Sequence, residues 1–309
     1  MKILFYNWVD FLDPERRGGG VTVYQRNLIS ELSRDESLNV SFLCSGLSYD
    51  VTGGSPRWEK LKHGPKSADC ERYEIVNSGT IAPSHHSFFD HAQIRHPATS
   101  EVFFDFLRAT GPYDIVHFNN LEGVPAEVLT LKDRWPDTRV ILSLHNYYPF
   151  CPQVNFWHQE SAHCKDFKGG TACATCIKPQ PPKALLKKAH ALAYRLKRNG
   201  VEPGSAAFDL TFRLVFGGGG RVVKLARSLK GQGQPTDPVT PTAQGEWFYE
   251  RRTKMINLIN TYCDRVLCVS DRVCDIAKQY GIDPDKAVTS YIGSRESDRY
   301  LKTAPRASL

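Results

Sequence analysis

The sequence lacks a hydrophobic run long enough to cross a membrane. None of its apolar stretches approaches the roughly 20 residues that span a bilayer. The amino terminus also lacks the apolar segment of a secretory signal, because Trp8, Asp10 and Asp13 interrupt the stretch where it would lie. We therefore expect a cytoplasmic chain whose first strand begins almost at once.

Common phosphate-binding and nucleic-acid-binding motifs are also missing. The glycine run at 18–20 is not a G-x-G-x-x-G element, and the run at 217–220 is not followed by the Lys-Ser/Thr pair of a P-loop. No groove-reading motif or base-stacking array accompanies the basic residues. We therefore expect no nucleic-acid partner.

The composition is that of a globular protein with an uneven charge. The chain has 309 residues, 41% hydrophobic and 24% charged, which is enough to bury a sizeable core. Its net charge is +7, but residues 183–232 hold eleven Lys and Arg against Glu202 and Asp209, a net charge of +9 that leaves −2 for the remainder. The basic character belongs to one segment, which favours an anionic surface.

Short apolar runs alternate with amphipathic helical stretches along most of the chain. This alternation predicts an α/β protein with a doubly wound, Rossmann-like parallel sheet, whose ligands lie outside the carboxyl ends of the strands. A largely helical insertion at 149–245 interrupts it. Strands are expected at 2–9, 38–45, 114–118, 139–144, 265–269 and 286–292, with a short one near Ile75. Helices are expected after the first glycine run and at 99–109, 123–132, 246–262 and 273–280.

Several polar or flexible residues follow these strands and so stand at the carboxyl edge. The glycines at 18–20 lie between a strand and a helix, where backbone N–H groups can meet a phosphate, although a tight turn is the alternative reading. His145 and Asn146 follow the strand at 139–144, where the alternative is a structural histidine. Asn119 and Asn120 follow the strand at 114–118 and are candidates to bind sugar hydroxyls, or simply begin a loop.

Four of the nine cysteines cluster within 26 residues. Their spacing is C-x12-C-x8-C-x2-C, and the close bite of the last pair suits a tetrahedral ion. In a reducing compartment zinc is favoured over disulfides, although disulfides and free thiols are the alternatives. Four thiolates leave no open position, so the zinc would be structural, and His158 or His163 could replace one cysteine. The candidate ligands are Cys151, Cys164, Cys173 and Cys176.

The basic segment begins with an amphipathic helix. Leu185, Ala189, Leu192 and Leu196 fall at helical spacing within KALLKKAHALAYRLKR. One reading is a solvated helix packed on the domain. The other is a helix lying in the interface of an anionic membrane, reinforced by the rest of residues 183–230, with each Lys or Arg near anionic lipid contributing about 1 kcal/mol.

Three stretches together resemble a known family. ILFYNWV…GGGVTVYQRNLISEL, DIVHFNN…VILSLHNYYPFCP and DRVLCVSDRVCDIAKQYGI…VTSYIG are similar, in order and spacing, to the amino-terminal domain of family 4 glycosyltransferases. These are retaining enzymes with two Rossmann-like domains, an architecture called GT-B. Some members also carry HN or HD, then CP, then three further cysteines. The resemblance covers most of the chain outside the insertion at 179–245.

The resemblance implies an acceptor-binding domain of an enzyme that moves a hexosyl unit from a nucleotide sugar to a glycan or a lipid-linked glycan. It matches His145 to the family's active-site histidine, which contacts the transferred sugar. It places Gly19 and Gly20 against the diphosphate of the donor, and we expect Asn119, Asn120 and Asn146 to contact substrate.

The resemblance stops where the donor-binding domain would begin, at residues 291–293. We expect one acceptor-binding domain over 1–293, with the cysteine segment at 149–178 and the basic insertion at 179–245 inside it, and a tail at 294–309. The chain would then be a truncated form, a pseudogene-like fragment, or one subunit of a split enzyme with a donor-domain partner chain. The alternative is a noncatalytic, zinc-stapled binding module that docks on a membrane, at its inner face, or on a catalytic partner.

Overall fold

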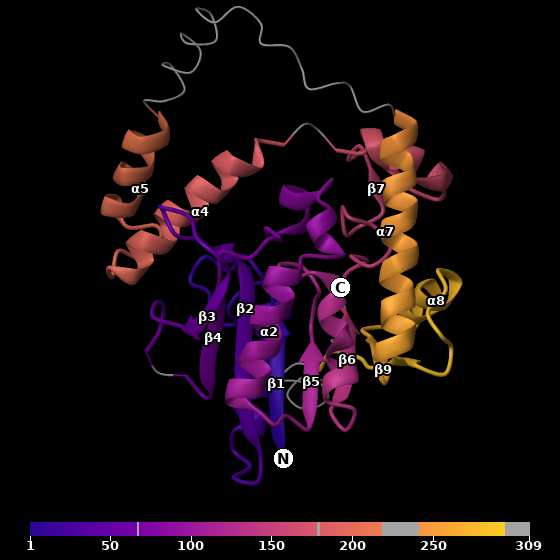
Figure 1. The fold of residues 1–309 in the computed structure, drawn as a ribbon, viewed down its shortest axis with the longest axis horizontal. Coiled ribbons are helices and arrows are strands. Elements are labelled where there is room, and N and C mark those ends of the chain that lie inside the picture. Colours follow the sequence, from indigo (N-terminus) through magenta and orange to yellow (C-terminus); the bar gives the residue numbers. More distant parts are fainter. Residues whose placement is uncertain (67, 178–179, 218–240, 294–309) are drawn as a thin grey trace, which may run out of the picture.

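The chain folds as an α/β protein around an eight-stranded, mostly parallel sheet flanked by helices, as the alternating pattern predicts. The computed structural model describes residues 1–66, 68–177, 180–217 and 241–293. Figure 1 shows the sheet with its amino-terminal edge, marked by the start of the chain, opposite the elements of the insertion. The architecture is that of a doubly wound, Rossmann-like fold.

The sheet has the strand order β10-β9-β6-β5-β1-β2-β4-β3. All neighbouring strands are parallel except β3, which pairs antiparallel with β4. Only Trp58 is apolar in the edge strand β3, which is why the apolar pattern predicts no strand there. The strands are β1 (Lys2–Asn7), β2 (Asn39–Ser48), β3 (Arg57–Lys60), β4 (Glu71–Val76), β5 (Ile115–Phe118), β6 (Arg139–Leu144), β9 (Arg265–Cys268) and β10 (Ala287–Thr289).

Helices connect these strands, and most begin within two residues of their predicted start. Two expected helices differ. The one expected at 246–262 begins five residues earlier, at Pro241. The one expected at 123–132 is a 3-10 helix, η3 (Ala126–Thr130), followed by the short α3 (Leu131–Arg134), because Pro125 at its N-cap has an extended backbone conformation. The remaining helices outside the insertion are α1 (Gly19–Leu32), η1 (Ser84–Ser87), η2 (His91–Gln93), α2 (Pro97–Thr110), α7 (Pro241–Tyr262) and α8 (Asp271–Gln279).

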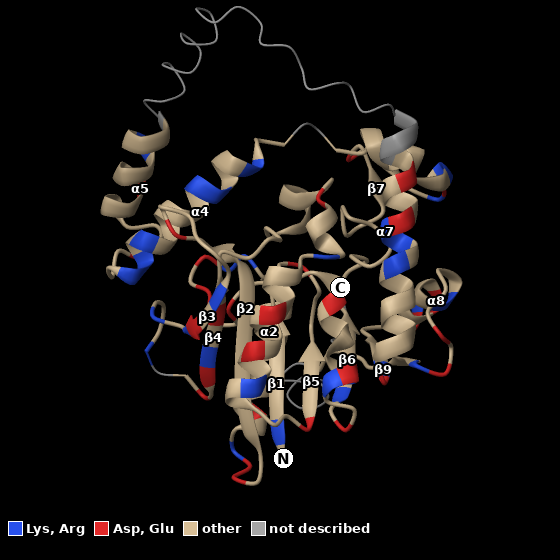
Figure 2. Cartoon of the chain, in the orientation of Figure 1, with Lys and Arg blue, Asp and Glu red and all other residues tan. Residues whose placement is uncertain are grey.

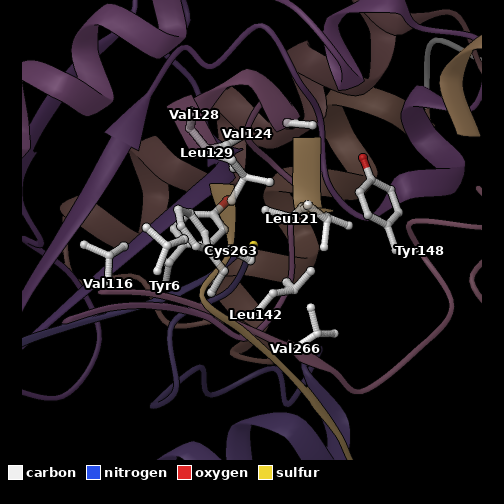
Figure 3. Packing of buried hydrophobic residues seen from close by; sticks show 14 of the residues in the cluster. Tyr6, Val116, Leu121, Val124, Val128, Leu129, Leu142, Tyr148, Cys263 and Val266 are labelled. Carbon is white, nitrogen blue, oxygen red and sulfur yellow. The ribbon is translucent and has the colours of Figure 1, made fainter. Parts of the chain in front are cut away.

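The sheet is buried on both faces, and β1 shows it most clearly. Leu4 and Tyr6 belong to the larger core cluster, which α2 and α7 cover, whereas Ile3 and Phe5 belong to a second cluster that includes Ile29 of α1. Figure 3 shows part of the larger cluster, contributed by neighbouring strands and by the segment that ends in η3. Burial of each such apolar side chain contributes about 1.5–3 kcal/mol, so the continuous apolar strand of a parallel sheet is stabilised from both sides.

The insertion between β6 and β9 consists of separate small elements above the carboxyl ends of the strands. It contains the hairpin of β7 (Trp157–His158) and β8 (Ala162–His163), the 3-10 segment η4 (Lys168–Thr175), α4 (Lys183–Arg198), α5 (Ala206–Phe212) and the π-helical η5 (Arg213–Gly217). Residues 218–240 of the expected basic insertion and the expected tail at 294–309 lie outside the described residues. Within the described ranges, no helix combines the length and the apolar character needed to cross a membrane.

Candidate functional site

The strand order reverses between β1 and β5, and the candidate residues lie where these strands end. From β1 the chain builds outward through β2 and β4, then returns to β5 and continues through β6 on the other side. In open α/β sheets the crevice at this reversal is the usual ligand site. Asn119 and Asn120 follow β5, and His145 and Asn146 follow β6, so the sequence-predicted residues come together at the reversal point.

One nitrogen of the His145 imidazole has a hydrogen-bond partner, and the other is buried without a partner among the described residues. Its Nε2 lies 3.2 Å from Oδ1 of Asn119, and its ring centre lies 5.2 Å from that of Tyr24 on α1. Burial lowers the pKa of His145 to about 4, so the ring is neutral at pH 7. Because Asn119 Oδ1 can only accept, Nε2 carries the proton and Nδ1 keeps its lone pair. Nδ1 has no hydrogen-bond partner among the described residues.

A buried carboxylate organises the two remaining asparagines. Oε1 of Glu122 accepts hydrogen bonds from Nδ2 of Asn120 at 3.0 Å and from Nδ2 of Asn146 at 3.2 Å. Its Oε2 accepts from the backbone N–H of Ser84 at 2.5 Å. Burial raises the pKa of Glu122, and these donors act against that rise. Asn120 and Asn146 are therefore fixed in place by Glu122.

Glu122 is not among the residues predicted from the sequence, although the sequence carries a signal for it. It lies two residues after Asn120 in a segment flanked by Leu121 and Val124, both fully buried. An acidic residue between apolar neighbours just after a strand must be paired with donors, because an unpaired buried carboxylate is costly. The nearby asparagines are those donors.

The glycine run forms the start of α1, and its three members differ. A side chain on Gly18 would collide with Thr22 and Val9, so this position must stay a glycine for packing. Gly19 has a φ of +54°, and both Gly19 and Gly20 are exposed, with nothing within 4 Å of an added Cβ. No side chain among the described residues caps this helix start, and its first turn holds no acidic residue. The N–H of Gly19 donates to the carbonyl of Arg16 at 3.1 Å, whereas the N–H groups that follow have no side-chain cap among the described residues, a favourable setting for an anion.

Tyr24 connects this turn to the imidazole. It lies four residues after Gly20, about one turn along α1, and its ring packs against His145. The helix start and the histidine thus lie on the same side of the sheet edge.

The four clustered cysteines lie together in what we term the cysteine loop, residues 149–177. Burial raises the pKa of Cys173 to about 12, and Cys151 adds to the rise. The thiol of Cys176 lies 2.8 Å from Oε1 of Gln153, and that of Cys164 donates to the carbonyl of Asp166 at 3.7 Å. All nine cysteines fall within the described ranges and are free.

The four thiols lie near one another, because Cys151, Cys176 and Cys164 all add to the rise in the pKa of Cys173. In the part of the chain that the structure describes, no group of three or more His, Cys, Asp or Glu is placed to hold a metal ion. Zinc binding at Cys151, Cys164, Cys173 and Cys176 therefore stays a prediction. His158 is instead engaged through Nε2, which lies 3.1 Å from the carbonyl of Ala172.

Two arginines of α7, which are not among the residues predicted from the sequence, hold the segment after His145. Arg251 is fully buried and donates to the carbonyl of Tyr148 at 3.0 Å and to Oε1 of Gln93. Arg252 donates through Nε to the carbonyl of Phe150 at 2.8 Å and lies 3.4 Å over the ring of Phe167. Fixed cations on a long helix therefore position this loop.

A close approach of two glycines completes the attachment of the cysteine loop. Gly170 has a φ of +97°, and an added Cβ would collide with the carbonyl of Gly245 at the start of the described side chains of α7. Phe88, Trp247 and Phe248 pack with Cys173 and Cys176 in a small core of their own. The loop is thus part of the packed structure.

The basic helices, which we define as α4 through η5 (residues 183–217), pack differently from the prediction. The buried residues of α4 are Ala191 and Tyr194, whereas Leu185 of the expected apolar stripe is 45% exposed. Figure 2 shows Lys and Arg along α4, which carries no acidic residue. Beyond it, Leu210, Leu214 and Val215 are exposed by 56%, 71% and 53%.

Comparison with known proteins identified no matching family model and no matching curated protein.

Proposed function

We propose that this chain is the acceptor-binding part of a retaining, family 4-like glycosyltransferase, which moves a hexosyl unit from a nucleotide sugar to a glycan or a lipid-linked glycan. One observation carries the proposal. A neutral imidazole with a buried, unpartnered Nδ1, that of His145, packs on Tyr24 of α1 at the point where the strand order reverses, and no side chain among the described residues caps the start of that helix.

The two features suit the two charged parts of a glycosyl-transfer transition state. The leaving diphosphate gains negative charge, which the uncapped N–H groups and the dipole of α1 would stabilise. The sugar becomes oxocarbenium-like, and His145 Nδ1 would accept a hydrogen bond from one of its hydroxyls. Asn119 orients the ring through Nε2, and the buried Nδ1 would become accessible when the sugar enters the site.

The glycine turn offers a sharp test of donor binding. An added side chain at Gly20 meets no atom within 4 Å, so Gly20→Asp should fold, and a carboxylate in the first turn of a helix is favourable for the helix itself. The same charge would repel a diphosphate. We expect Gly20→Asp to weaken the binding of UDP-glucose or GDP-mannose by about 10-fold or more, which corresponds to about 1.4 kcal/mol.

The matched control is Gly20→Ala, which adds a neutral methyl group at the same open position. It should bind nucleotide sugar as the original chain does. Calorimetric titration with each nucleotide sugar, alone and with a donor-domain partner present, measures the effect. If neither the chain nor its complex binds nucleotide sugar or transfers a hexosyl unit, the enzyme proposal fails.

A noncatalytic module that docks on anionic membranes is the second candidate, and the basic helices favour it. Their apolar residues Leu210, Leu214 and Val215 are exposed next to Arg213. The helix α4 has no acidic residue of its own, and its Lys183 and Arg198 pair with Asp90 and Glu59 of the domain. Such a surface suits the interface of an anionic bilayer. Leu214→Ser should reduce co-sedimentation with phosphatidylserine vesicles while leaving stability within about 0.5 kcal/mol.

The matched control is Val23→Ser, which replaces another exposed apolar residue, far along the chain on α1. It should leave vesicle binding unchanged. Binding that is equal for phosphatidylserine and phosphatidylcholine vesicles would count against this candidate.

A further inference from the structure

The contact between helix α4 and the domain contains two neighbouring histidines. Figure 1 shows α4 above the carboxyl ends of the strands, and it packs there against β2 and η1. The ring centre of His190, in the middle of α4, lies 6.0 Å from that of Tyr49, which follows β2. It also lies 5.9 Å from that of His86 on η1, whose ring centre is 4.4 Å from that of His85. The imidazole of His190 is therefore partly buried by the contact itself.

The apolar part of this contact is small. Ala191 and Leu186 of α4 pack in one cluster with Tyr49 and Ile81. Lys187 lies over the ring of Tyr49, 5.2 Å from its centre. Because few apolar side chains hold α4 in place, a charge that enters the contact can shift the balance between the docked and the released helix.

Cations surround His190. After burial, the groups that lower its pKa most are His86, Arg17 in the loop after β1, and Lys197, which lies two turns further along α4. The helix α4 itself carries no acidic residue. A proton on His190 therefore meets positive charge from the helix and from the domain.

The carboxylates at this contact are already paired. Asp90, which precedes η2, pairs with Lys183 of α4, and Glu59 of β3 lies 3.8 Å from a guanidinium nitrogen of Arg198. The helix α5 also packs on α4, and its one charged residue, Asp209, is exposed. Within the described ranges, no carboxylate forms an ion pair with the α4 imidazole, so a protonated ring has no acidic partner there.

Docking and protonation of His190 oppose each other. Burial lowers the pKa of docked His190 to about 3, whereas an exposed imidazole titrates near 6.5. The released helix therefore binds the proton more tightly than the docked helix does. Docking is at full strength above pH 6.5 and weakens as the pH falls from 6.5 toward 3.

We propose that acidification releases α4 from the domain, because protonation of His190 places an unpaired positive charge beside His86 in the contact between α4, η1 and the end of β2. Gly200, which follows α4, has a φ of +77° and nothing within 4 Å of an added Cβ, so the chain has room to turn there. The released helix exposes Leu186 and Ala191 beside its lysines. This device does not depend on sugar transfer.

The test is hydrogen exchange of the full chain at pH 7.5 and pH 5.0, corrected for the intrinsic exchange rate at each pH. We expect the protection of α4 to fall about 30-fold at pH 5.0, the factor that one proton with a free pKa of 6.5 gives. At both pH values α4 should be less protected than β1. Equal protection of α4 and β1 at pH 5.0 would mean that α4 leaves only when the whole chain unfolds, and this result overturns the proposal.

His190→Phe keeps an aromatic ring between Tyr49 and His86 but takes up no proton. It should make the fall in α4 protection smaller by at least about 10-fold. His190→Gln is the second variant, in case the larger ring of Phe disturbs the contact, and it should act in the same way. The control is His163→Gln, at an exposed histidine of β8, which should keep the fall of the original chain.

Equal falls in the original chain and in both His190 variants overturn the proposal. A pKa of His190 near 6.5 in the intact chain, measured by NMR, overturns it as well, because docking would then leave the affinity for the proton unchanged. Neither measurement uses a nucleotide sugar, so this inference and the glycosyltransferase proposal can fail separately.

Discussion

The cysteine loop and the basic helices belong to the same insertion but are attached to the domain in different ways. The cysteine loop is held by the buried cation of Arg251, by Arg252 and by the close approach of Gly170 to Gly245. The basic helices contribute few buried residues, Ala191 and Tyr194 on α4 and Phe208 on α5. The first segment is thus built into the core next to His145, whereas the second exposes apolar side chains and pairs Lys183 and Arg198 with carboxylates of the domain.

The largest expected effect is the loss of the buried cation under the cysteine loop. Arg251→Ala leaves the carbonyls of Tyr148 and Pro149 and Oε1 of Gln93 without their donor. We expect the free energy of unfolding to fall by about 4 kcal/mol, measured by urea denaturation. Lys254→Ala, on the exposed side of the same helix, should change it by less than about 0.5 kcal/mol. Similar decreases in the free energy of unfolding for both variants would show that α7 does not fix the cysteine loop.

The next effect concerns the proposed zinc. If Cys173 is a ligand, Cys173→Ser should lower the free energy of unfolding by about 3 kcal/mol and release about one zinc ion per chain, as read by elemental analysis. Cys70→Ser changes a thiol far from the cysteine loop in sequence and should release no metal. If Cys173→Ser unfolds with the same free energy as the original chain, and the original chain contains no metal, the prediction of zinc is wrong.

The free energy of unfolding should depend on pH through the protonation of His145. Its pKa in the folded chain is about 4, below its ordinary value of 6.5, so the unfolded chain takes up the proton first. The stability from the neutral ring is present above pH 6.5 and is lost as the pH falls toward 4. Between pH 7 and pH 5 this loss amounts to about 2 kcal/mol.

The comparison of the original chain with His145→Asn isolates that contribution. The buried His117 and His190, whose pKa values burial lowers to about 3, titrate in both proteins. Denaturation curves at pH 7 and pH 5 should therefore differ less in the variant. Equal pH dependence in both proteins would mean that His145 is solvated rather than buried.

The smallest effect is expected at α4. Tyr194→Phe removes the hydroxyl that donates to Glu59 at 2.6 Å, which should cost about 1 kcal/mol. Because α4 has few buried contacts, we expect hydrogen exchange to accelerate in α4 while the sheet stays protected. Acceleration throughout the sheet would show that the basic helices are as firmly attached as the cysteine loop.

The sequence predicted the sheet better than the connections between its strands. The β6 run at 139–144 was predicted to the residue, because a parallel strand buried on both faces is a continuous apolar run between polar ends. The edge strand β3 was missed, since RWEK has no such run. On α4 the helical periodicity predicts an apolar stripe that includes Leu185, whereas the buried residues are Ala191 and Tyr194. The spacing of apolar residues does not specify the surface against which a helix packs.

The residues of the candidate site also differ in how well the sequence predicts their positions. His145, Asn146, Asn119 and Asn120 could be placed at one edge from strand boundaries alone, because parallel strands end together. Glu122 could be placed only in part, because its bond to Asn120 is local whereas Asn146 is 24 residues away. Arg251 could not be placed, because its partner Tyr148 is 103 residues away along the chain. The pairing of a buried charge is decided by what the folded chain brings next to it.

The sequence by itself determined the alternation of strands and helices, the glycine turn, the cluster of cysteines and the segment that carries the positive charge. These are local properties, set by the spacing of apolar side chains and by the residue types within a few turns. The tertiary structure decided which nitrogen of His145 lacks a partner among the described residues, which rings lie beside His190, and that arginines of α7 hold the cysteine loop. Each of these depends on burial and hydrogen bonding between segments far apart in the chain, which only close packing in three dimensions can specify.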